Sequence, residues 1–410
     1  MGKKKLIVVW PYRFRDFDWQ RFELEQLSPH VEIHVHELID ALTPEFATAY
    51  ANQSEHPSVK RFSSLKEWRR EFKKVSKDSV IFTHVQPTNL KSTLICITLR
   101  KSKTIGFLLG GVVLSETDEQ IQQFAKLKRF YHFLRRNCLF FAMPDYVAVG
   151  GSESEERERR DFQTCTRIIH MNSFDYSQYL RGLGEDQSKV AGAVYLDTGV
   201  PASASDFLPK GQIELKKDLN VSFGVYLDNG FPGFRGDFII RKIDPTVEPK
   251  HWYVRLNLLF ESIEDSLSLT VHVLAHPKHW GRDYSQYFGS RKVIGNQTAN
   301  FVKDATLVFG LTSTSISYAV LFNKPLILVT SDQIQNDQKQ YIAENLANIS
   351  AETGARIFNI DREYTEQELR EALVIDYAKR ESYKRKYLTS RTDDKPNYQV
   401  LLDEVINAVD

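Results

Sequence analysis

Short apolar runs alternate with amphipathic stretches along most of the chain. Six runs in the first half and five in the second have the length and composition of buried strands. The expected strands are residues 6–10, 31–36, 80–85, 104–109, 146–149 and 167–170, then 221–227, 269–275, 293–294, 306–309 and 325–330. Helical spacing between them, as at 252–263 and 315–322, predicts an α/β protein with parallel sheets.

The pattern is lost between Glu185 and Asp218, where Ser, Ala, Gly and Pro replace the periodic residues. We therefore expect two Rossmann-like domains, residues 1–185 and 186–384, facing each other across a cleft. From about Asp332 onward the chain is rich in Glu, Lys and Gln, which favours helices. We expect the last helix, about residues 385–410, to pack back on the first domain.

The composition limits the classes of protein to which the chain could belong. The 410 residues include 54 Lys and Arg against 53 Asp and Glu, without the basic excess of most nucleic-acid-binding proteins. No run approaches the roughly 20 apolar residues that span a bilayer. Cys96, Cys138 and Cys165 are spaced for neither a disulfide framework nor a zinc site. We expect a soluble cytoplasmic protein without a nucleic-acid partner.

Four hydroxyl residues, Thr312, Ser313, Thr314 and Ser315, stand between an expected strand and an expected helix. Hydroxyl groups and the free N–H groups of a first helical turn can bind an anion, and the helix dipole assists. A plain helix cap would need only one of the four hydroxyls. The block therefore favours phosphate binding over capping alone.

Two further segments follow expected strands of the second half. A histidine at a strand's carboxyl end, such as His276, can donate to a phosphate, and Pro277 fixes the turn before Lys278. A surface histidine without a function explains the same pattern. Gln297 and Thr298 precede a helix, where a nucleotide contact and a plain cap fit the sequence equally well.

Carboxylates could complete a site. Tyr195-Leu-Asp-Thr-Gly recurs as Tyr226-Leu-Asp-Asn-Gly, which gives Asp197 and Asp228 matching positions at the ends of strands. The alternative for Asp228 is a structural Asx turn. In the first half, Glu153 and Glu155 follow the strand 146–149 and are the acidic residues most suited to face a cleft.

Several familiar motifs are missing. The sequence has no dinucleotide-binding glycine motif, no P-loop and no nucleophile elbow. Its one Asp-x-Asp, Asp16-Phe-Asp, follows the first strand, far from the half expected to bind the donor, and no histidines show zinc spacing. We expect neither a metal nor another cofactor.

Four segments carry a resemblance to a known family: Val273-Leu-Ala-His-Pro-Lys, Phe288-Gly-Ser-Arg, Thr312-Ser-Thr-Ser-Ile-Ser-Tyr and Lys324-Pro-Leu-Ile. Together they resemble bacterial surface-polysaccharide transferases, and most of all the retaining β-Kdo transferases of O-antigen and capsule assembly, which are distant relatives of bacterial sialyltransferases. The resemblance spans roughly residues 146–330 and is weaker over the first 140.

The resemblance implies a GT-B fold, a CMP-Kdo donor (Kdo is 3-deoxy-D-manno-octulosonic acid) and an oligosaccharide or lipid-linked glycan acceptor. It implies that His276 and the hydroxyls of residues 313–315 hold the CMP phosphate. It also implies an aspartate nucleophile, for which Asp228 is preferred to Asp197. Glu153 would be the general base for the acceptor. Such a transferase is compatible with peripheral association with the cytoplasmic face of the inner membrane.

Two alternatives stay open. In an inverting transferase of the CMP-sialic-acid type, the aspartate is the base and attacks nothing. In a binding module without activity, the same fold would hold a glycan or a nucleotide. A covalent sugar adduct separates the first alternative from the double displacement, and release of CMP separates the second from either enzyme.

Overall fold

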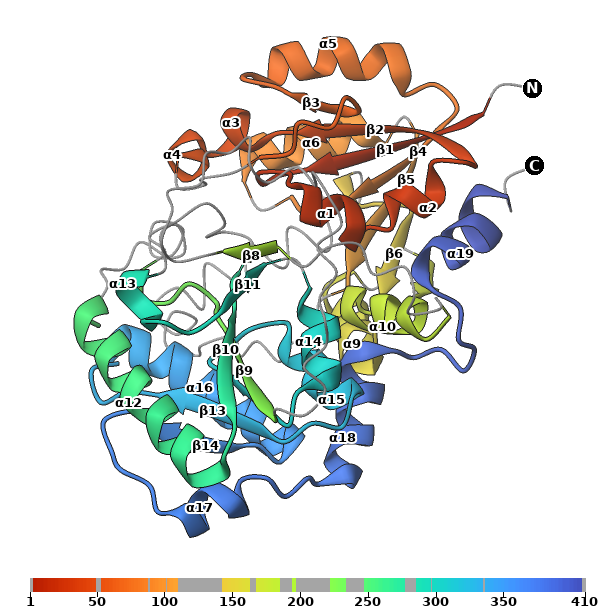
Figure 1. Cartoon of the computed structure of the whole chain (residues 1–410). Coiled ribbons are helices and arrows are strands. Elements are labelled where there is room, and N and C mark those ends of the chain that lie inside the picture. The colour runs from red at the N-terminus through yellow and green to blue at the C-terminus, as the bar shows by residue number, and fades with distance from the viewer. Residues whose placement is uncertain are drawn as a thin grey trace. The chain divides into compact units, whose positions relative to one another are not determined.

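The computed structural model describes residues 3–48, 53–87, 89–100, 102–109, 142–162, 167–184, 194–196, 222–233, 247–276, 285–295, 297–334 and 336–407. The chain divides into two compact units (Figure 1). Unit 1 comprises Met1–Gly111, Asp118–Arg181 and Arg385–Asp410, and unit 2 contains Gly182–Lys384. Each unit contains one sheet of seven described strands.

The sheet of unit 1 is parallel throughout, in the order β3-β2-β1-β4-β5-β6-β7. Its strands are β1 (Lys4–Trp10), β2 (Val31–Glu37), β3 (Val59–Arg61), β4 (Ser79–Thr83), β5 (Lys103–Leu108), β6 (Tyr146–Val149) and β7 (Arg167–His170). The helices between them are α1 (Asp16–Arg21), α2 (Leu24–Leu27), α3 (Ile39–Leu42), α4 (Pro44–Ala47), α5 (Leu65–Val75), α6 (Leu90–Leu99), α9 (Ser152–Phe162) and α10 (Phe174–Gly184).

Both faces of this sheet are covered, because successive side chains of a strand point to opposite sides. Leu6 and Val8 of β1 belong to one buried cluster, and Ile7 and Val9 belong to another. A parallel strand buried on both faces has no polar side to present. This is why the central strands are continuous apolar runs in the sequence.

The end of the chain belongs to unit 1. It consists of a π-helical turn (Lys384–Leu388), α19 (Asn397–Leu401) and a second π-helical turn (Leu402–Ile406). The N–H of Asn172 donates to Oδ1 of Asn397 at 2.8 Å, and Nδ2 of Asn397 donates back to the carbonyl of Asn172 at 2.9 Å. A Cβ on Gly151 would lie 2.7 Å from the carbonyl carbon of Lys386. The glycine after β6 therefore makes room for this returning segment.

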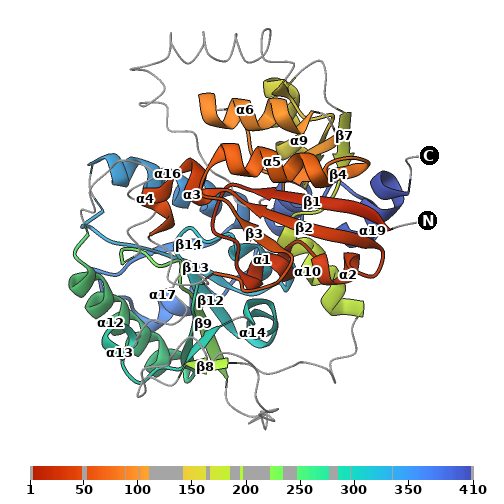
Figure 2. The same ribbon diagram turned by 90° about the horizontal axis from the view of Figure 1, so that it is seen from above.

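The sheet of unit 2 has the order β14-β13-β12-β9-β10-β11-β8. Figure 2 labels β14, β13, β12, β9 and β8 of this sheet. Its strands are β8 (Val194–Leu196), β9 (Phe223–Leu227), β10 (Thr270–Leu274), β11 (Val293–Gly295), β12 (Leu307–Gly310), β13 (Leu326–Thr330) and β14 (Arg356–Asn359). All pairs are parallel except that of β8 with β11. The helices are α12 (Pro249–Leu267), α13 (Ser285–Phe288), α14 (Thr298–Asp304), α15 (Ile316–Leu321), α16 (Asn336–Thr353), α17 (Glu366–Glu371) and α18 (Tyr377–Tyr383).

The predicted fold class, α/β with two Rossmann-like domains, is confirmed. Two described strands were not predicted, β3 and β14, and both lie at sheet edges. β8 coincides with the strand that the repeated segment suggested before Asp197. The helices expected after Asp332 are present, with β14 between α16 and α17. An edge strand has a neighbour on one side only and is often short and partly exposed, so it lacks a continuous apolar run. No described helix is long and apolar enough to cross a membrane.

Candidate functional site

The strand order of unit 2 reverses next to β9. From β9 the chain passes through α12 to β10 and on to β11, on one side of the sheet. It then crosses through α14 to β12, which pairs with β9 on the other side. Ligands of open α/β sheets bind at the carboxyl ends of the strands where the order reverses. In unit 2 that place is the carboxyl ends of β9 and β12.

The register of the strands brings the predicted donor-site residues to this edge. Leu227 of β9 is level with Leu274 of β10 and with Gly310 of β12. Asp228 follows this row by one residue, and His276 and Thr312 each follow it by two. Neighbouring strands lie about 4.8 Å apart. The segments that carry these residues therefore leave the sheet side by side.

Asp228 is buried, with 3% of its surface exposed. Its N–H donates to the carbonyl of Leu274 at 3.1 Å, and its Oδ1 accepts the N–H of Gly230 at 2.9 Å. The Asx turn considered as the structural alternative is therefore present. The turn holds the carboxyl group in place through Oδ1.

Beneath Asp228, two aromatic side chains fill the space between β9 and α12. Tyr226 and Trp252 are both fully buried, and Trp252 packs edge to face with Phe231 at 4.9 Å between ring centroids. Burial raises the pKa of the Tyr226 phenol well above its usual value, and the nearby Asp228 carboxylate raises it further. The Asp228 carboxylate therefore lies near the buried Tyr226 phenol.

The hydroxyl block leads into α15 without being one uniform cap. Ser313 is buried, and its Oγ accepts the N–H of Ser315 at 3.3 Å. Thr314 is exposed, while Thr312 and Ser315 are half-buried. The hydroxyl of Ser315, at the N-cap of α15, makes no capping bond. Of the four hydroxyls, that of Ser313 accepts a backbone N–H. The block therefore contains more hydroxyl groups than the start of the helix requires.

The remaining donor-side residues lie along the same edge where the structure describes them. His276 is half-buried two residues after β10. Gln297, the N-cap of α14, and Thr298 follow β11, which pairs with β10. Pro277 and Lys278 lie outside the described residues.

The two aspartates of the repeated segment follow strands that run in opposite directions. β9 is parallel to β10, whereas β8 is antiparallel to β11, with Leu196 level with Val293 at the start of β11. The carboxyl end of β8 therefore lies at the edge opposite to the one from which Asp228 emerges. Asp197 itself lies outside the described residues.

In unit 1, Glu153 and Glu155 lie in the first turn of α9, after β6. Glu153 is exposed. Glu155 accepts from Arg159 at 2.6 Å and lies 3.6 Å from Nδ1 of His170, so its carboxylate is already engaged. Glu158, one turn further along, is buried and was missed because a single acidic residue in a charged helix gives no sign of burial.

A second polar cluster at the same edge of unit 2 was also missed. Asp361, two residues after β14, accepts from Ser331 Oγ at 2.6 Å and pairs with His251 Nε2 at 2.7 Å. Burial alone would raise the pKa of Asp361, but hydrogen bonds from Ser331, the N–H of Asp332 and His251 outweigh it and lower that pKa. The cluster ties the start of α12 to the ends of β13 and β14. Its members are far apart in the chain, so no local motif reveals it.

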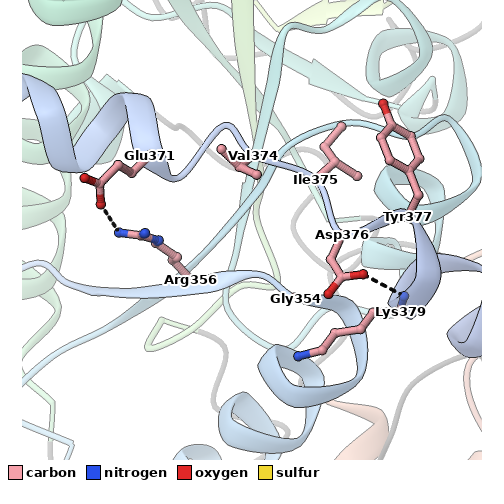
Figure 3. A pocket seen from close by; sticks show the side chains of 8 residues that line it. All are labelled: Gly354, Arg356, Glu371, Val374, Ile375, Asp376, Tyr377 and Lys379. Atoms are coloured by element: carbon pink, nitrogen blue, oxygen red, sulfur yellow. Dashed lines mark hydrogen bonds and ion pairs between the residues drawn. The ribbon is translucent and has the colours of Figure 1, made fainter.

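A groove in unit 2 lies elsewhere. It has a volume of about 610 Å³. Figure 3 shows its lining: Gly354, Arg356, Glu371, Val374, Ile375, Asp376, Tyr377 and Lys379. Arg356 is the first residue of β14, so the groove lies toward the amino ends of the strands. Arg356 pairs with Glu371 at 3.0 Å, and Asp376 accepts the backbone N–H of Lys379 at 3.0 Å. It shares no lining residue with the switch-point edge.

No protein-family model matches the sequence, and no curated protein matches it either. Among solved structures, the chain is similar to the wall teichoic acid polymerase TagF, with a TM-score of 0.52 and 10% identity over 99% of this chain and 88% of that one. A histidine-to-alanine variant of TagF has a TM-score of 0.51 and 10% identity, over 100% of this chain and 90% of that one. The UDP-GlcNAc 2-epimerase from Methanocaldococcus jannaschii has a TM-score of 0.48 and 12% identity, over 98% of this chain and 99% of that one. At this identity the TagF comparisons establish the fold alone, which is GT-B-like with two Rossmann-like domains.

Proposed function

We propose that the chain is a glycosyltransferase that moves Kdo from CMP-Kdo to a glycan acceptor in bacterial surface-polysaccharide synthesis. The observation that carries the proposal is the switch-point edge of unit 2, where Asp228, His276 and the hydroxyl block follow neighbouring strands. A carboxylate beside several hydrogen-bond donors suits a sugar joined to a phosphate. The GT-B-like fold is consistent with glycosyl transfer.

The proposed reaction has two displacements. Asp228 attacks the anomeric carbon of Kdo, the bond to the phosphate oxygen breaks, and CMP leaves with both electrons of that bond. His276, Ser313 and Thr314 stabilise the charge on the departing phosphate, which is the main task because CMP is a good leaving group. An acceptor hydroxyl then attacks the same carbon and the Asp228 ester breaks. Two inversions give net retention.

The acceptor hydroxyl must lose a proton in the second displacement. We assign this proton to Glu153, because its neighbour Glu155 is held by Arg159 and His170. Glu153→Gln should slow transfer to the acceptor and leave formation of the sugar adduct unchanged. Glu155→Gln is the matched control and should alter transfer little.

A donor panel tests the proposed function. Release of the nucleotide is measured with CMP-Kdo, CMP-sialic acid, UDP-sugars and CDPG, the last because a TagF variant has been soaked with CDPG. We expect release from CMP-Kdo that persists in EDTA, and none from an Asp228→Asn variant. Turnover of another donor alone would refute the Kdo assignment. No release from any donor would favour a module that only binds.

Intact-mass measurement with CMP-Kdo and without acceptor tests the mechanism. A protein heavier by one sugar, with the adduct mapped to Asp228, is the expected result. An adduct on Asp197 would keep the double displacement and move the nucleophile. An inverted product without any adduct would support the inverting alternative, in which the aspartate is the base.

A further inference from the structure

Helix α6 presents an apolar stripe to solvent. Leu90 is 76% exposed and Ile97 is 38% exposed, with the half-buried Leu94 between them. Residues spaced by four and seven positions lie on one face of a helix. The opposite face already fills the core of unit 1 through Ile95 and Leu99. The stripe is therefore apolar surface beyond what the core requires.

Helix α5 lies alongside α6 (Figure 2). Arg69 holds the two helices together, because its Nε donates to Thr98 Oγ1 at 3.1 Å and its guanidinium donates to the carbonyl of Leu94 at 3.2 Å. The inner face of α5 buries Trp68 and Phe72. Its exposed basic residues are Lys66, Arg70, Lys73 and Lys74.

The charge of this region departs from that of the chain. Residues 65–100 hold eight Lys and Arg against three Asp and Glu, whereas the whole chain is almost balanced, at 54 against 53. Glu71 pairs with Lys60 and Lys74, at 3.0 and 2.7 Å. Within the part of the chain that the structure describes, Lys66 and Lys73 meet no carboxylate. The net positive charge beside the stripe is thus largely uncompensated.

We propose that the exposed faces of α5 and α6 form a docking surface for membranes that contain anionic phospholipids. Apolar side chains can enter the boundary between headgroups and acyl chains, while flanking lysines attract the negative surface. A nucleic acid would use the basic residues but would give Leu90 and Ile97 little apolar surface to contact. The surface lies in unit 1, and its test requires no glycosyl transfer. The docking proposal is therefore tested independently of the proposed reaction.

Co-sedimentation of the full chain with vesicles tests the surface. We expect binding to vesicles of phosphatidylcholine with phosphatidylglycerol, little binding to phosphatidylcholine alone, and weaker binding at high salt. Leu90→Glu with Ile97→Glu, and separately Lys66→Glu with Lys73→Glu, should each lower the partition coefficient by about tenfold or more.

Unit 2 offers matched controls. Val254 and Leu258 of α12 are 51% and 48% exposed, so Val254→Glu with Leu258→Glu changes apolar surface of similar exposure. Lys250→Glu with Lys379→Glu changes the same net charge. Both control pairs should lower vesicle binding less than threefold. Thermal unfolding shows whether each variant is folded.

Three results would overturn the proposal. One is equal binding to neutral and anionic vesicles. Another is an equal loss in the α5 and α6 variants and in the unit 2 controls. The third is a change of oligomeric state by light scattering in Leu90→Glu with Ile97→Glu while vesicle binding is unchanged, which would make the stripe an interface between copies.

Discussion

The backbone N–H of Gly230 donates to Oδ1 of Asp228 at 2.9 Å, so the carboxylate proposed as nucleophile also holds the turn after β9. Asparagine keeps an acceptor oxygen in this place and removes the charge. We expect Asp228→Asn to retain the melting temperature and CMP affinity of the wild type while transfer falls by several orders of magnitude. Asp228→Ala should also lose the turn bond, at a cost of about 1 kcal/mol.

Thermal unfolding, calorimetry with CMP and the release assay measure these three quantities. Asp197→Asn is the matched control from the repeated segment and should cost little activity. A fully active Asp228→Asn would remove this residue from the mechanism. Equal losses of stability and activity would reduce it to the turn residue that the hydrogen bond already shows.

The hydroxyl block predicts different effects on stability for two neighbouring variants, Ser313→Ala and Thr314→Ala. Ser313→Ala removes the acceptor for the N–H of Ser315 and should cost about 1 kcal/mol of stability. Thr314 is exposed, so Thr314→Ala should leave stability unchanged. If both hydroxyls contact the phosphate, each variant should weaken CMP binding by about tenfold, since a bond to a charged group contributes about 1.5 kcal/mol or more. Calorimetry that shows unchanged affinity for Thr314→Ala would assign the block to capping alone.

Central strands could be predicted from sequence because burial on both faces leaves a continuous apolar run. The expected strand 146–149 coincides with the buried β6, while 167–170 coincides with β7, which was predicted although it lies at the sheet edge. The three-residue β3, Val-Lys-Arg, has no such run, and neither does the partly exposed β14. Their pairing depends on the sheet edge that the rest of the chain builds, which is information that no local window contains.

The residues of the candidate site also differ in whether the sequence reveals them. Asp228, His276 and Thr312 were recognisable because each follows a strand, and parallel strands end at a common edge. The cluster of His251, Ser331 and Asp361 was not recognisable, since tertiary structure alone brings together residues from a helix start and two separate strand ends. The Asx turn at Asp228 shows a further limit, because a structural role and a chemical role can share one side chain.

Gly151 predicts a stability effect at the place where the end of the chain returns to unit 1. An alanine Cβ would collide with the backbone of Lys386 and lie 2.9 Å from the carbonyl carbon of Tyr387, and neither backbone atom can move aside as a side chain would. We expect Gly151→Ala to destabilise unit 1 by about 2 kcal/mol or more. Gly182→Ala is the control, because a Cβ there meets nothing within 4 Å and the residue lies in α10.

Gly182→Ala should stabilise by up to about 1 kcal/mol, since alanine favours a helix over glycine. Denaturant unfolding of both variants gives the sign of each change in unfolding free energy. Hydrogen exchange of residues 385–407 should rise in Gly151→Ala only. An unchanged unfolding free energy for Gly151→Ala would mean that the returning segment does not pack against this turn.

His36 predicts how stability depends on pH. The side chain is buried in unit 1, and its Nδ1 accepts the indole N–H of Trp68 at 3.2 Å. Burial, with smaller effects from His34 and Lys60, lowers the pKa of His36 to about 3. The unfolded imidazole takes up its proton near pH 6.5. Between about pH 6.5 and 3 the unfolded state therefore binds more protons than the folded state, so stability falls as the pH falls through this window.

At pH 5 the expected loss from this one group is about 2 kcal/mol relative to pH 8. Burial also lowers the pKa of His84 and His272, which gives slopes of the same sign. A variant must therefore isolate His36. Asparagine can offer its carbonyl oxygen to Trp68 but does not titrate, so His36→Asn should be less stable at pH 8 and lose less stability by pH 5. Denaturant unfolding of both proteins at the two pH values gives the difference between their losses. Equal losses would show that the folded protein admits a proton at His36, and that the bond from Trp68 does not hold the ring neutral.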